Sequence, residues 1–308
     1  MTVVFATHNG GWKLRRMLEA LTASTLNRKF WKIVAVDNNS TDDTPAILRE
    51  YQSRLPLEVL SEPRPGKGHA LNTAFRHIEG DLVVITDDDV IPEPDWLEQY
   101  LKLAEQNPDY DMFSGLIEPE WEKQPESWIL DWVDLAPIYA LNGNMAPGPI
   151  SARHIFGPNS AFRTRILPAT YTVETLDVGP DAKRRQYAMG GDTAFAMNLE
   201  TQGHKALHSR APAVRHIIPK AYVDKGWILK RAERFGKGAV HFYPRRYASK
   251  PQILGIPASL ILRLSASFIA ASGASILPKS RKAWDILWTY RMRKGAVEEL
   301  YRKARAVR

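Results

Sequence analysis

The chain has 308 residues, of which 44% are hydrophobic and 25% are charged, a composition typical of a folded globular protein. It contains no cysteine, which excludes disulfides and thiolate catalysis and is compatible with a reducing compartment. The net charge of +8 is concentrated at one end, because residues 241–308 hold 14 of the 42 Lys and Arg but only 3 of the 34 Asp and Glu. Such a basic end indicates a nucleic-acid partner, an anionic membrane surface or a solvated helix face.

Strands alternate with helices through the first 90 residues. Short apolar runs predict strands, and apolar residues that recur every three or four positions predict helices. The predicted strands span residues 3–6, 31–36, 57–60 and 82–85, and a predicted helix follows each of the first three. Because this alternation is typical of right-handed crossovers, the sequence predicts an α/β fold with a mostly parallel sheet.

Three consecutive carboxylates, Asp87 to Asp89, directly follow the apolar run 82–85. Adjacent acids repel one another unless a cation or a row of donors lies among them, so a metal site is favoured over a solvated turn. The polar clusters 7–9 and 37–39 also follow predicted strands. Ligands of open α/β sheets bind beyond the carboxyl ends of the strands, so the three clusters together predict a site for a nucleotide or another phosphorylated ligand.

The middle of the chain gives weaker patterns. Residues 118–150 are rich in Trp, Pro and Gly without a sustained period and predict a loop-rich region. Asp192 opens a predicted helix and is either an N-cap or a functional acid. Further helices are predicted over 94–108 and 222–235, with strands over 111–117, 205–208 and 213–216, and a turn leading into a strand over 156–162.

The run 253–277 is almost entirely apolar. Ser259, Arg263 and Ser267 lie four residues apart and predict a narrow polar stripe on an otherwise apolar helix. With basic residues on both sides of the run, we expect an interfacial helix that faces anionic lipid. A buried helix, or a homo-oligomer contact through Ala266, Ala270 and Ala274, fits the pattern equally well.

Seven segments resemble, in order, the inverting glycosyltransferases of family 2, which have the GT-A fold. They are VVFATHNG, VDNNSTDDT, GKGHALNTAF, TDDD, FGPNSAFR, MGGDTAF and VRHIIP. The resemblance extends over roughly residues 2–240. TDDD is similar to the family's Asp-x-Asp (DXD) signature, and MGGDTAF is similar to the motif with the catalytic base. The resemblance implies a Rossmann-like sheet flanked by helices, with a nucleotide-sugar-binding half over 1–117 and an acceptor-binding, catalytic-base half over 118–240. A basic helical, membrane-associating extension would occupy 241–308.

The resemblance also implies roles for single residues. The nucleotide-sugar-binding residues would be Thr7, Asn9, Asp37, Asn39, Lys67, Asp87 and Asp88, the metal ligands Asp89 and His216, and the general base Asp192. A Mn²⁺ or Mg²⁺ ion would neutralise the charge that develops on the leaving diphosphate, while the base deprotonates an acceptor hydroxyl. The family usually has Glu before the catalytic Asp, whereas Gly191 stands there in this chain.

We therefore expect a metal-dependent inverting enzyme that transfers a sugar from a UDP- or GDP-sugar to a glycan, a polysaccharide or a lipid-linked acceptor, as in cell-envelope synthesis. One alternative is a sugar-1-phosphate nucleotidyltransferase, although the opening loop lacks a Gly-rich basic triphosphate cradle. Another is a non-catalytic protein with a GT-A-like fold that binds membranes or nucleic acid; the favoured function needs no nucleic acid. Because no signal-peptide pattern opens the chain, we expect a cytoplasmic protein, with peripheral docking on the cytoplasmic face of the membrane through residues 250–308.

Overall fold

A computed structural model describes residues 1–169, 171, 188–276 and 280–306, without the side chains of 274–276. The chain divides into two compact units. The first comprises Met1–Glu120, Tyr139–Thr175 and Gly191–Ile218, and the second comprises Trp121–Ile138, Leu176–Gly190 and Pro219–Arg308. The domain boundaries expected from the sequence stay a prediction.

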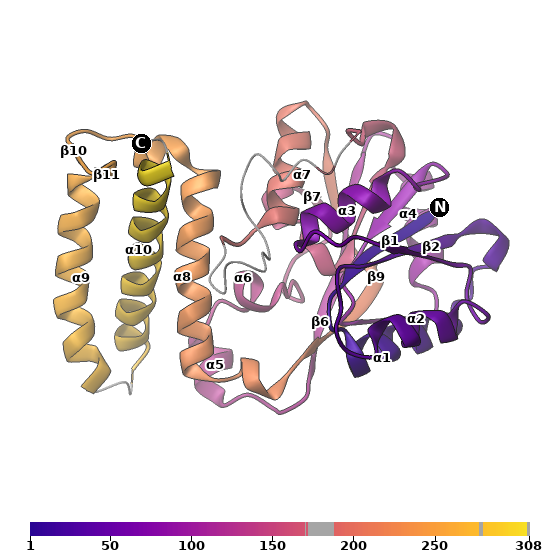
Figure 1. The fold of residues 1–308 in the computed structure, drawn as a ribbon, viewed down its shortest axis with the longest axis horizontal. Helices are drawn as coiled ribbons and strands as arrows, with labels where there is room; N and C mark the ends of the chain where they lie inside the picture. Colours follow the sequence, from indigo (N-terminus) through magenta and orange to yellow (C-terminus); the bar gives the residue numbers. More distant parts are fainter. Residues whose placement is uncertain (170, 172–187, 277–279, 307–308) are drawn as a thin grey trace. The chain divides into compact units, whose positions relative to one another are not determined.

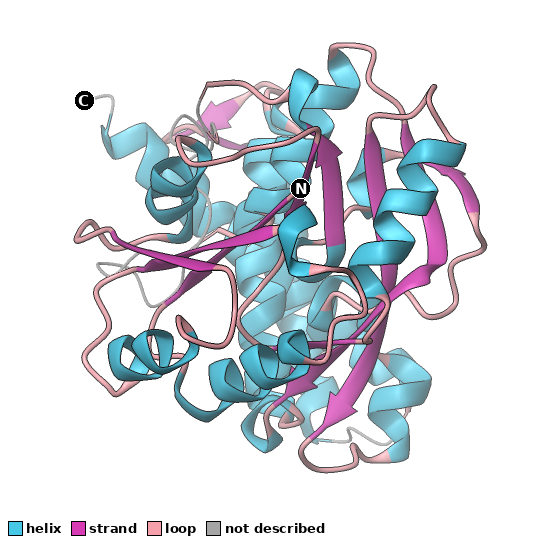
Figure 2. Ribbon diagram, turned by 90° about the vertical axis from the view of Figure 1, so that its right-hand side faces the viewer, coloured by secondary structure: helices cyan, strands magenta, loops and turns pink. Residues whose placement is uncertain are grey.

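A sheet with nine strands in the described part of the chain forms the core of the first unit, and Figure 2 shows its strands in magenta with helices packed against them. The strands are β1 (Thr2–Thr7), β2 (Lys32–Asp37), β3 (Leu57–Ser61), β4 (Leu82–Ile85), β5 (Val90–Pro92), β6 (Met112–Trp121), β7 (Gly148–Ile150), β8 (Ser160–Arg163) and β9 (Ala206–Ile218). Their order is β3-β2-β1-β4-β8-β6-β9-β5, and β7 pairs with β9.

The strands predicted in the first 90 residues form the parallel part of this sheet. β1 pairs in parallel with β2 and β4, and β2 pairs in parallel with β3. Their apolar residues are almost completely buried, as expected for parallel strands covered on both faces. β8 then adds to β4 in the antiparallel direction. The predicted α/β fold with its mostly parallel sheet is confirmed.

The helices of the first unit connect these strands. They are α1 (Gly11–Thr22), α2 (Thr44–Tyr51), α3 (Lys67–Phe75), α4 (Trp96–Gln106) and α7 (Gly191–Thr201), with short 3-10 turns η1 (Arg28–Phe30), η2 (Ala152–His154), η3 (Gly157–Asn159) and η4 (Thr164–Ile166). The apolar residues of α1 apart from the exposed Trp12 pack inward, since Leu14, Met17, Leu18 and Leu21 are buried, so this helix covers the sheet as its pattern indicates. Lys67, a candidate nucleotide-sugar-binding residue, lies in the first turn of α3.

Two other sequence predictions need correction. The two short strands predicted over 205–208 and 213–216 are one continuous strand, β9, whose exposed residues Arg210 and Ala211 interrupt the buried pattern without ending the strand. The region 118–150 holds the short helices α5 (Ser127–Trp132) and α6 (Leu135–Tyr139). Helices of five or six residues are too short to show a 3.6-residue period, so no periodic pattern indicated them.

The second unit is mainly helical. Its long helices are α8 (Lys225–Phe242), α9 (Ala258–Ile276) and α10 (Arg281–Ala306), with 3-10 turns η5 (Lys220–Tyr222) and η6 (Pro244–Tyr247) and a small hairpin of β10 (Gln252–Ile253) and β11 (Ile256–Pro257). Within this unit α10 packs against both α8 and α9 (Figure 1).

Glycines allow α8 and α10 to approach closely. A Cβ atom at Gly236 would clash with the carbonyl oxygen of Met292, and one at Gly295 would clash with that of Glu233. For α8, the sequence predicted an end at residue 235, just before Gly236 and Gly238. The glycines instead serve the contact between two backbones, so α8 continues to Phe242.

The helix predicted in the run 253–277 exists as α9, but its polar stripe is only partly exposed. Ser259 and Arg263 are exposed, whereas Ser267 is buried and donates to the carbonyl oxygen of Leu264 at 2.9 Å. Ala266 and Ala270 are exposed, and the side chain of Ala274 lies outside the described residues. In the described part of the chain, no helix has both the length and the apolar character needed to cross a membrane.

Candidate active site

The acidic turn Asp87 to Asp89 lies between β4 and β5, and pairing of β5 brings a distant strand to it. β5 pairs antiparallel with β9 so that Val90 lies opposite His216, and the backbone N–H of Ile217 donates to the carbonyl oxygen of Asp89 at 2.8 Å. The register of two strands therefore places His216 beside the acids, although more than 120 residues separate them in the sequence.

Asp89 lies between two groups that carry or can accept a proton. The Nζ atom of Lys13, from α1, is 3.1 Å from its Oδ2 atom, and the Nε2 atom of His216 is 3.4 Å from its Oδ1 atom. Burial raises the pKa of Asp89, but His216 and Lys13 outweigh burial and hold this pKa below its usual value. Burial lowers the pKa of His216, and the Asp89 carboxylate more than reverses that effect.

Asp88 has the opposite electrostatic environment. Burial and the neighbouring charge of Asp89 raise its pKa to about 6, against the hydrogen bond that the Thr7 hydroxyl donates to its Oδ2 atom at 2.5 Å. Gly10 allows this contact, since a Cβ atom there would clash with Thr7 and Asp88. Two adjacent carboxylates thus have their pKa values driven apart, which is a frequent mark of a functional site.

Lys67 joins Asp87 to Asp192. Its Nζ atom is 2.5 Å from Asp87 Oδ1 and about equally far, 3.0 and 3.1 Å, from the two carboxylate oxygens of Asp192. The Tyr171 hydroxyl also donates to Asp192 Oδ1 at 2.8 Å. Burial lowers the pKa of Lys67, but the carboxylates of Asp192 and Asp87 outweigh it and hold this pKa above its usual value. Asp192, at the start of α7, therefore belongs to the same cluster as the acidic turn.

The other predicted site residues lie at the end of β2 and in the loops after β1 and β2. These two loops are joined by hydrogen bonds. Asn9 Oδ1 accepts from the backbone N–H of Thr41 at 2.8 Å, and Asp37 Oδ1 accepts from that of Ser40 at 3.1 Å. Asn9 and Asn39 both have positive φ, at 53° and 61°, a conformation that Asn tolerates better than most residues. The two loops thus form one connected rim, next to Thr7 at the end of β1.

A divalent cation fits part of this cluster. His216 Nδ1 donates to the carbonyl oxygen of Tyr139 at 2.7 Å, which leaves Nε2 of the neutral ring with a lone pair on the side of Asp89. A carboxylate oxygen and an imidazole nitrogen suit Mn²⁺ and similar ions. Among the described residues no group of three or more His, Cys, Asp or Glu could hold a metal ion, so further ligands would have to come from elsewhere.

Sequence reasoning missed three residues of this cluster. Lys13 is one of three cations on the amphipathic helix α1, and Tyr171 lies in a segment without any periodic pattern, so neither gave a signal. Gly157 is in a motif that the sequence analysis singled out, but its contact was not foreseen: a Cβ atom there would clash with the Asp192 carboxylate and lie 3.0 Å from Lys67 Nζ.

Gly157 is held in place by a buried asparagine two residues further on. Asn159 is completely buried, and its Oδ1 atom accepts hydrogen bonds from Trp96 Nε1 at 2.8 Å and from the Tyr100 hydroxyl at 2.7 Å. Its Nδ2 atom donates to the carbonyl oxygens of Leu116 and Pro212. All the hydrogen-bonding capacity of this amide is directed at the sheet and α4, so the turn η3 is fixed beside the acids.

Comparison with known proteins gives a family and relatives. A family profile described as glycosyl transferase family 2 matches residues 2–168. An uncharacterized glycosyltransferase of Haemophilus influenzae is 36% identical over 106 residues, which cover 34% of this chain and 39% of that protein. An undecaprenyl-phosphate 4-deoxy-4-formamido-L-arabinose transferase of Pseudomonas syringae is 27% identical over 210 residues, which cover 64% of this chain and 60% of that protein. The chain thus spans less than two thirds of the length of these relatives.

The fold also occurs in solved structures. The mannosyltransferase PcManGT of Pyrobaculum calidifontis, in complex with GDP-Man and Mn²⁺, superposes with a TM-score of 0.61 and 22% identity over 98% of this chain and 87% of that one. At this identity the likeness concerns the fold alone. The GT-A fold that the sequence predicted is confirmed.

Proposed function

Since this chain belongs to glycosyl transferase family 2, we propose that it is a glycosyltransferase that uses a nucleoside-diphosphate sugar and a divalent cation and inverts the anomeric carbon. The observation that carries this proposal is the single cluster in which Lys67 Nζ bonds to both Asp87 and Asp192. In this cluster a candidate donor-binding acid, Asp87, and a candidate general base, Asp192, both contact the same ammonium group.

The donor would lie along the carboxyl ends of β1, β2 and β4. We assign the nucleoside to the rim formed by Asn9, Asp37 and Asn39, with Asp37 accepting a hydrogen bond from the base. Thr7, Lys67, Asp87 and Asp88 would contact the ribose and the diphosphate. Support comes from the fold relative that was solved with GDP-Man and Mn²⁺ and from the general rule that ligands of α/β sheets bind at this edge.

Asp89 and His216 would hold a Mn²⁺ or Mg²⁺ ion, with diphosphate oxygens as further ligands. When bound, the cation would neutralise charge on the leaving diphosphate. The chain's own contribution is to orient these two ligands: Tyr139 fixes the ring of His216 through Nδ1, and the β5–β9 pairing fixes the backbone of Asp89. Lys13, which pairs with Asp89, would have to give up or share that contact.

Asp192 would act as the general base in a direct displacement. The acceptor hydroxyl loses its proton to Asp192, and its oxygen forms a bond to the anomeric carbon. The bond from that carbon to the phosphate oxygen breaks, and the nucleoside diphosphate leaves with the electron pair. The acceptor would be a hydroxyl of a glycan, a polysaccharide or a lipid-linked saccharide.

A donor panel tests this proposal. UDP- and GDP-sugars are incubated with the protein, Mn²⁺ and candidate acceptors, release of nucleoside diphosphate is measured, and the anomeric configuration of the product is read by NMR. We expect release from one class of donor and a product of inverted configuration. Release of inorganic pyrophosphate from a nucleoside triphosphate and a sugar phosphate would instead indicate nucleotidyl transfer, and a product of retained configuration would contradict direct displacement.

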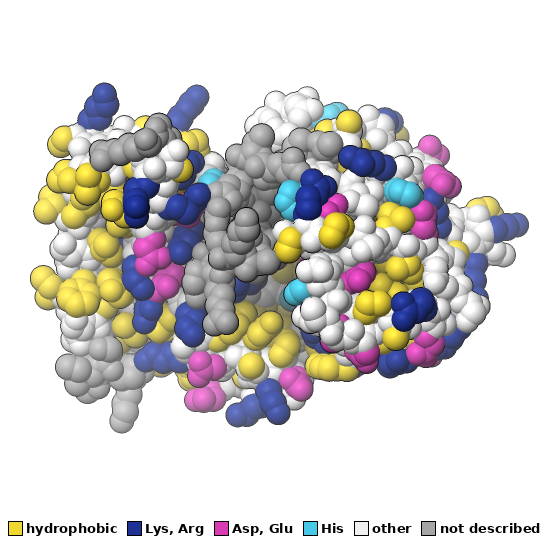
Figure 3. Space-filling view, in the orientation of Figure 1, with side chains coloured by type: hydrophobic (Ala, Val, Ile, Leu, Met, Phe, Trp, Pro, Cys, Tyr) yellow, Lys and Arg dark blue, Asp and Glu magenta, His cyan; other side chains and the backbone are white. Residues whose placement is uncertain are grey.

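We also propose that the second unit docks on an anionic membrane surface. The outer side of α9 carries large apolar side chains that are strongly exposed, Leu262 at 71% and Ile269 at 74%, and the hairpin that precedes it exposes Ile253 and Leu254. Figure 3 shows the hydrophobic side chains gathered over this helix. Exposed apolar surface of this kind needs a partner, and an interfacial helix would bury it among lipid acyl chains.

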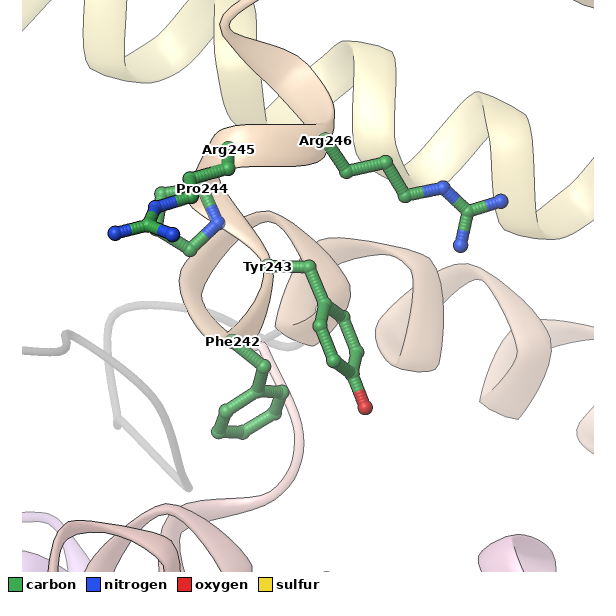
Figure 4. A pocket seen from close by; sticks show the side chains of 5 residues that line it. All are labelled: Phe242, Tyr243, Pro244, Arg245 and Arg246. Atoms are coloured by element: carbon green, nitrogen blue, oxygen red, sulfur yellow. The ribbon is translucent and has the colours of Figure 1, made fainter. Parts of the chain in front are cut away.

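Charge favours an anionic bilayer as that partner. No Asp or Glu occurs between Glu233 and Asp285, whereas Lys250 precedes α9 and Arg281 and Lys282 follow it. A hollow of about 410 Å³ where α8 ends and η6 begins is lined by Phe242, Tyr243, Pro244, Arg245 and Arg246. Figure 4 shows the two arginines extending away from each other above the aromatic rings. Cations near a bilayer surface each add about 1 kcal/mol of attraction to anionic lipid.

Vesicle sedimentation tests the docking. We expect the protein to sediment with vesicles that contain 30% phosphatidylglycerol but not with pure phosphatidylcholine, and we expect the double variant Leu262→Ser/Ile269→Ser to lose at least tenfold in affinity. Leu130→Ser is the matched control, because Leu130 is also exposed, at 42%, but lies on α5. Unchanged binding of the double variant, or a dimer in sedimentation velocity that this variant abolishes, would rule the docking out.

A further inference from the structure

The lysine that joins the two acidic parts of the site raises a question about the candidate base. Both carboxylate oxygens of Asp192 face Lys67 Nζ, at 3.0 and 3.1 Å. Its Oδ1 atom also accepts the hydrogen bond of Tyr171. In this arrangement Asp192 is paired with a cation, and a carboxylate paired in this way is a poor acceptor for the proton of a hydroxyl.

Lys67 has a second partner on the donor side. Its Nζ atom bonds to Asp87, which belongs to the acidic turn where the proposed function puts the diphosphate. Lys67 is thus shared between a candidate base and the place where new negative charge arrives. A diphosphate carries more charge than either carboxylate, so its arrival would compete for the same ammonium group.

We propose that Lys67 is a donor-controlled latch: it keeps Asp192 ion-paired while the donor site is empty, and a bound nucleoside diphosphate draws it away and frees Asp192. The inference rests on the proposed function, since it needs the diphosphate to bind at the acidic turn. The device would make the base available only when a donor is present. It concerns the regulation of the site and adds no chemical step.

The surroundings allow Lys67 to move while Asp192 stays. Lys67 opens α3 directly after Gly66, whose φ of 134° is accessible mainly to glycine, and its flexible four-carbon stem can reach several positions. Asp192 is held independently of Lys67: Tyr171 donates to it, and the Tyr171 ring stacks on Phe195 with centroids 4.5 Å apart. The missing side chain of Gly157 makes room for the Asp192 carboxylate at this position.

A fixed ion pair predicts something different from a latch. In the first case Lys67 either stays paired with Asp192 throughout or contacts only the diphosphate. Removal of the Asp192 charge then changes nucleotide affinity through long-range electrostatics alone. The size of that change does not depend on whether Lys67 is present. If Lys67 is a latch, Asp192 competes with the nucleotide for it. Removing that competitor then tightens nucleotide binding, and the gain requires Lys67.

Calorimetry on a double-mutant cycle separates these cases. UDP and GDP are titrated up to millimolar concentration, at fixed Mn²⁺, into the full chain as wild type, Asp192→Asn, Lys67→Met and the double variant. We expect Asp192→Asn to tighten binding about fivefold to tenfold, and to change it by less than about twofold when Lys67 is Met, because interacting neighbours are not additive. Lys67→Gln repeats the second arm should the Met variant fold poorly.

Glu118→Gln is the matched control, because Glu118 is an exposed acid of the same unit with no described contact to Lys67. It should leave nucleotide affinity unchanged. Equal tightening by Asp192→Asn in both Lys67 backgrounds, or no tightening in either, overturns the latch. Absence of UDP and GDP binding to the wild type would overturn the proposed function itself, so the two failures are distinguishable.

Discussion

Buried acids occur in both units of this molecule, but the two units differ in how many cations pair with each acid. In the helical unit, Glu233 lies 2.6 Å from Arg291 and 3.1 Å from Lys294, and Glu299 pairs with His241 and Arg302. Burial raises the pKa of Glu299, but His241 and Arg302 outweigh it and lower this pKa to about 2. Each of these acids has its own cations.

At the sheet edge four acids share fewer cations. Lys67 serves both Asp87 and Asp192, Lys13 and His216 serve Asp89, and Asp88 has only the Thr7 hydroxyl among the contacts described for it. The pKa of Asp88 consequently rises to about 6. The difference indicates that the acids of the helical unit stabilise the fold, whereas Asp88 at the sheet edge reduces stability when it is ionised.

The largest expected effect is on catalysis at the sheet edge. Asp192→Asn keeps the shape and the hydrogen bond from Tyr171 but removes the proton acceptor, so we expect kcat to fall by about 10³ to 10⁴. The melting temperature should change by only a few degrees. A variant with near-normal kcat would mean that another group takes the proton. Turnover of the purified variant with the donor that the panel of UDP- and GDP-sugars identifies measures this effect.

The next effect is on stability in the helical unit. Glu299→Gln leaves His241 and Arg302 near a neutral amide, and we expect it to lower the free energy of unfolding by about 2–4 kcal/mol, since breaking one partner of a buried pair is costly. Glu298→Gln is the matched control, because the Glu298 side chain is 42% exposed, so solvent screens its ion pairs with Lys237 and Lys294. Urea unfolding measures both. If both substitutions lowered the free energy of unfolding equally, the buried pairs of Glu299 would not be a special source of stability in the helical unit.

The stabilisation by Glu299 should depend on pH in one direction. Because its pKa is lowered to about 2 in the folded state, its contribution is complete above the unfolded value of about 4.3 and is lost as the pH falls toward 2. The stability difference between wild type and Glu299→Gln should therefore shrink between pH 5 and pH 3. Thermal unfolding followed across this range reports it, and a constant difference would argue against a charged Glu299 as the cause.

The smallest expected effect is on stability and concerns Asp88 at the sheet edge. Its sign is opposite to that of the Glu299→Gln effect. The pKa of Asp88 is raised, so ionisation of this group reduces stability as the pH rises from about 4, its unfolded value, through 6. Asp88→Asn should therefore stabilise the protein at pH 7 by about 1 kcal/mol, with no gain below pH 4. Nucleotide binding should weaken in the same variant. If Asp88→Asn instead lowered stability at pH 7, the hydrogen bond from Thr7 would require the charged Asp88 carboxylate.

The sequence predicted the parallel part of the fold well, because its strands are short apolar runs that end in polar clusters. It could not predict the long-range partners. His216 reaches Asp89 through the register of β5 on β9, and no local pattern encodes that register. The same holds for Tyr171 and Lys13, whose contacts to Asp192 and Asp89 depend on tertiary packing.

Glycine explains two of the misjudged features. Gly236 is a helix breaker by propensity, yet α8 continues through it because the α10 backbone lies against it. Gly157 was noted only as part of a turn, whereas its missing side chain leaves room for the Asp192 carboxylate. In both cases what matters is a neighbour from a distant part of the chain, which a single sequence does not reveal.

The most direct test of the central claim is calorimetric titration of UDP and GDP into wild type and Asp89→Asn, each with and without Mn²⁺. If the acids of the sheet edge form a metal-assisted donor site, Mn²⁺ should tighten binding of one nucleotide to the wild type by at least about tenfold, or about 1.4 kcal/mol, and have little effect on Asp89→Asn. Tight nucleotide binding that responds to neither Mn²⁺ nor the loss of the Asp89 charge would contradict the account.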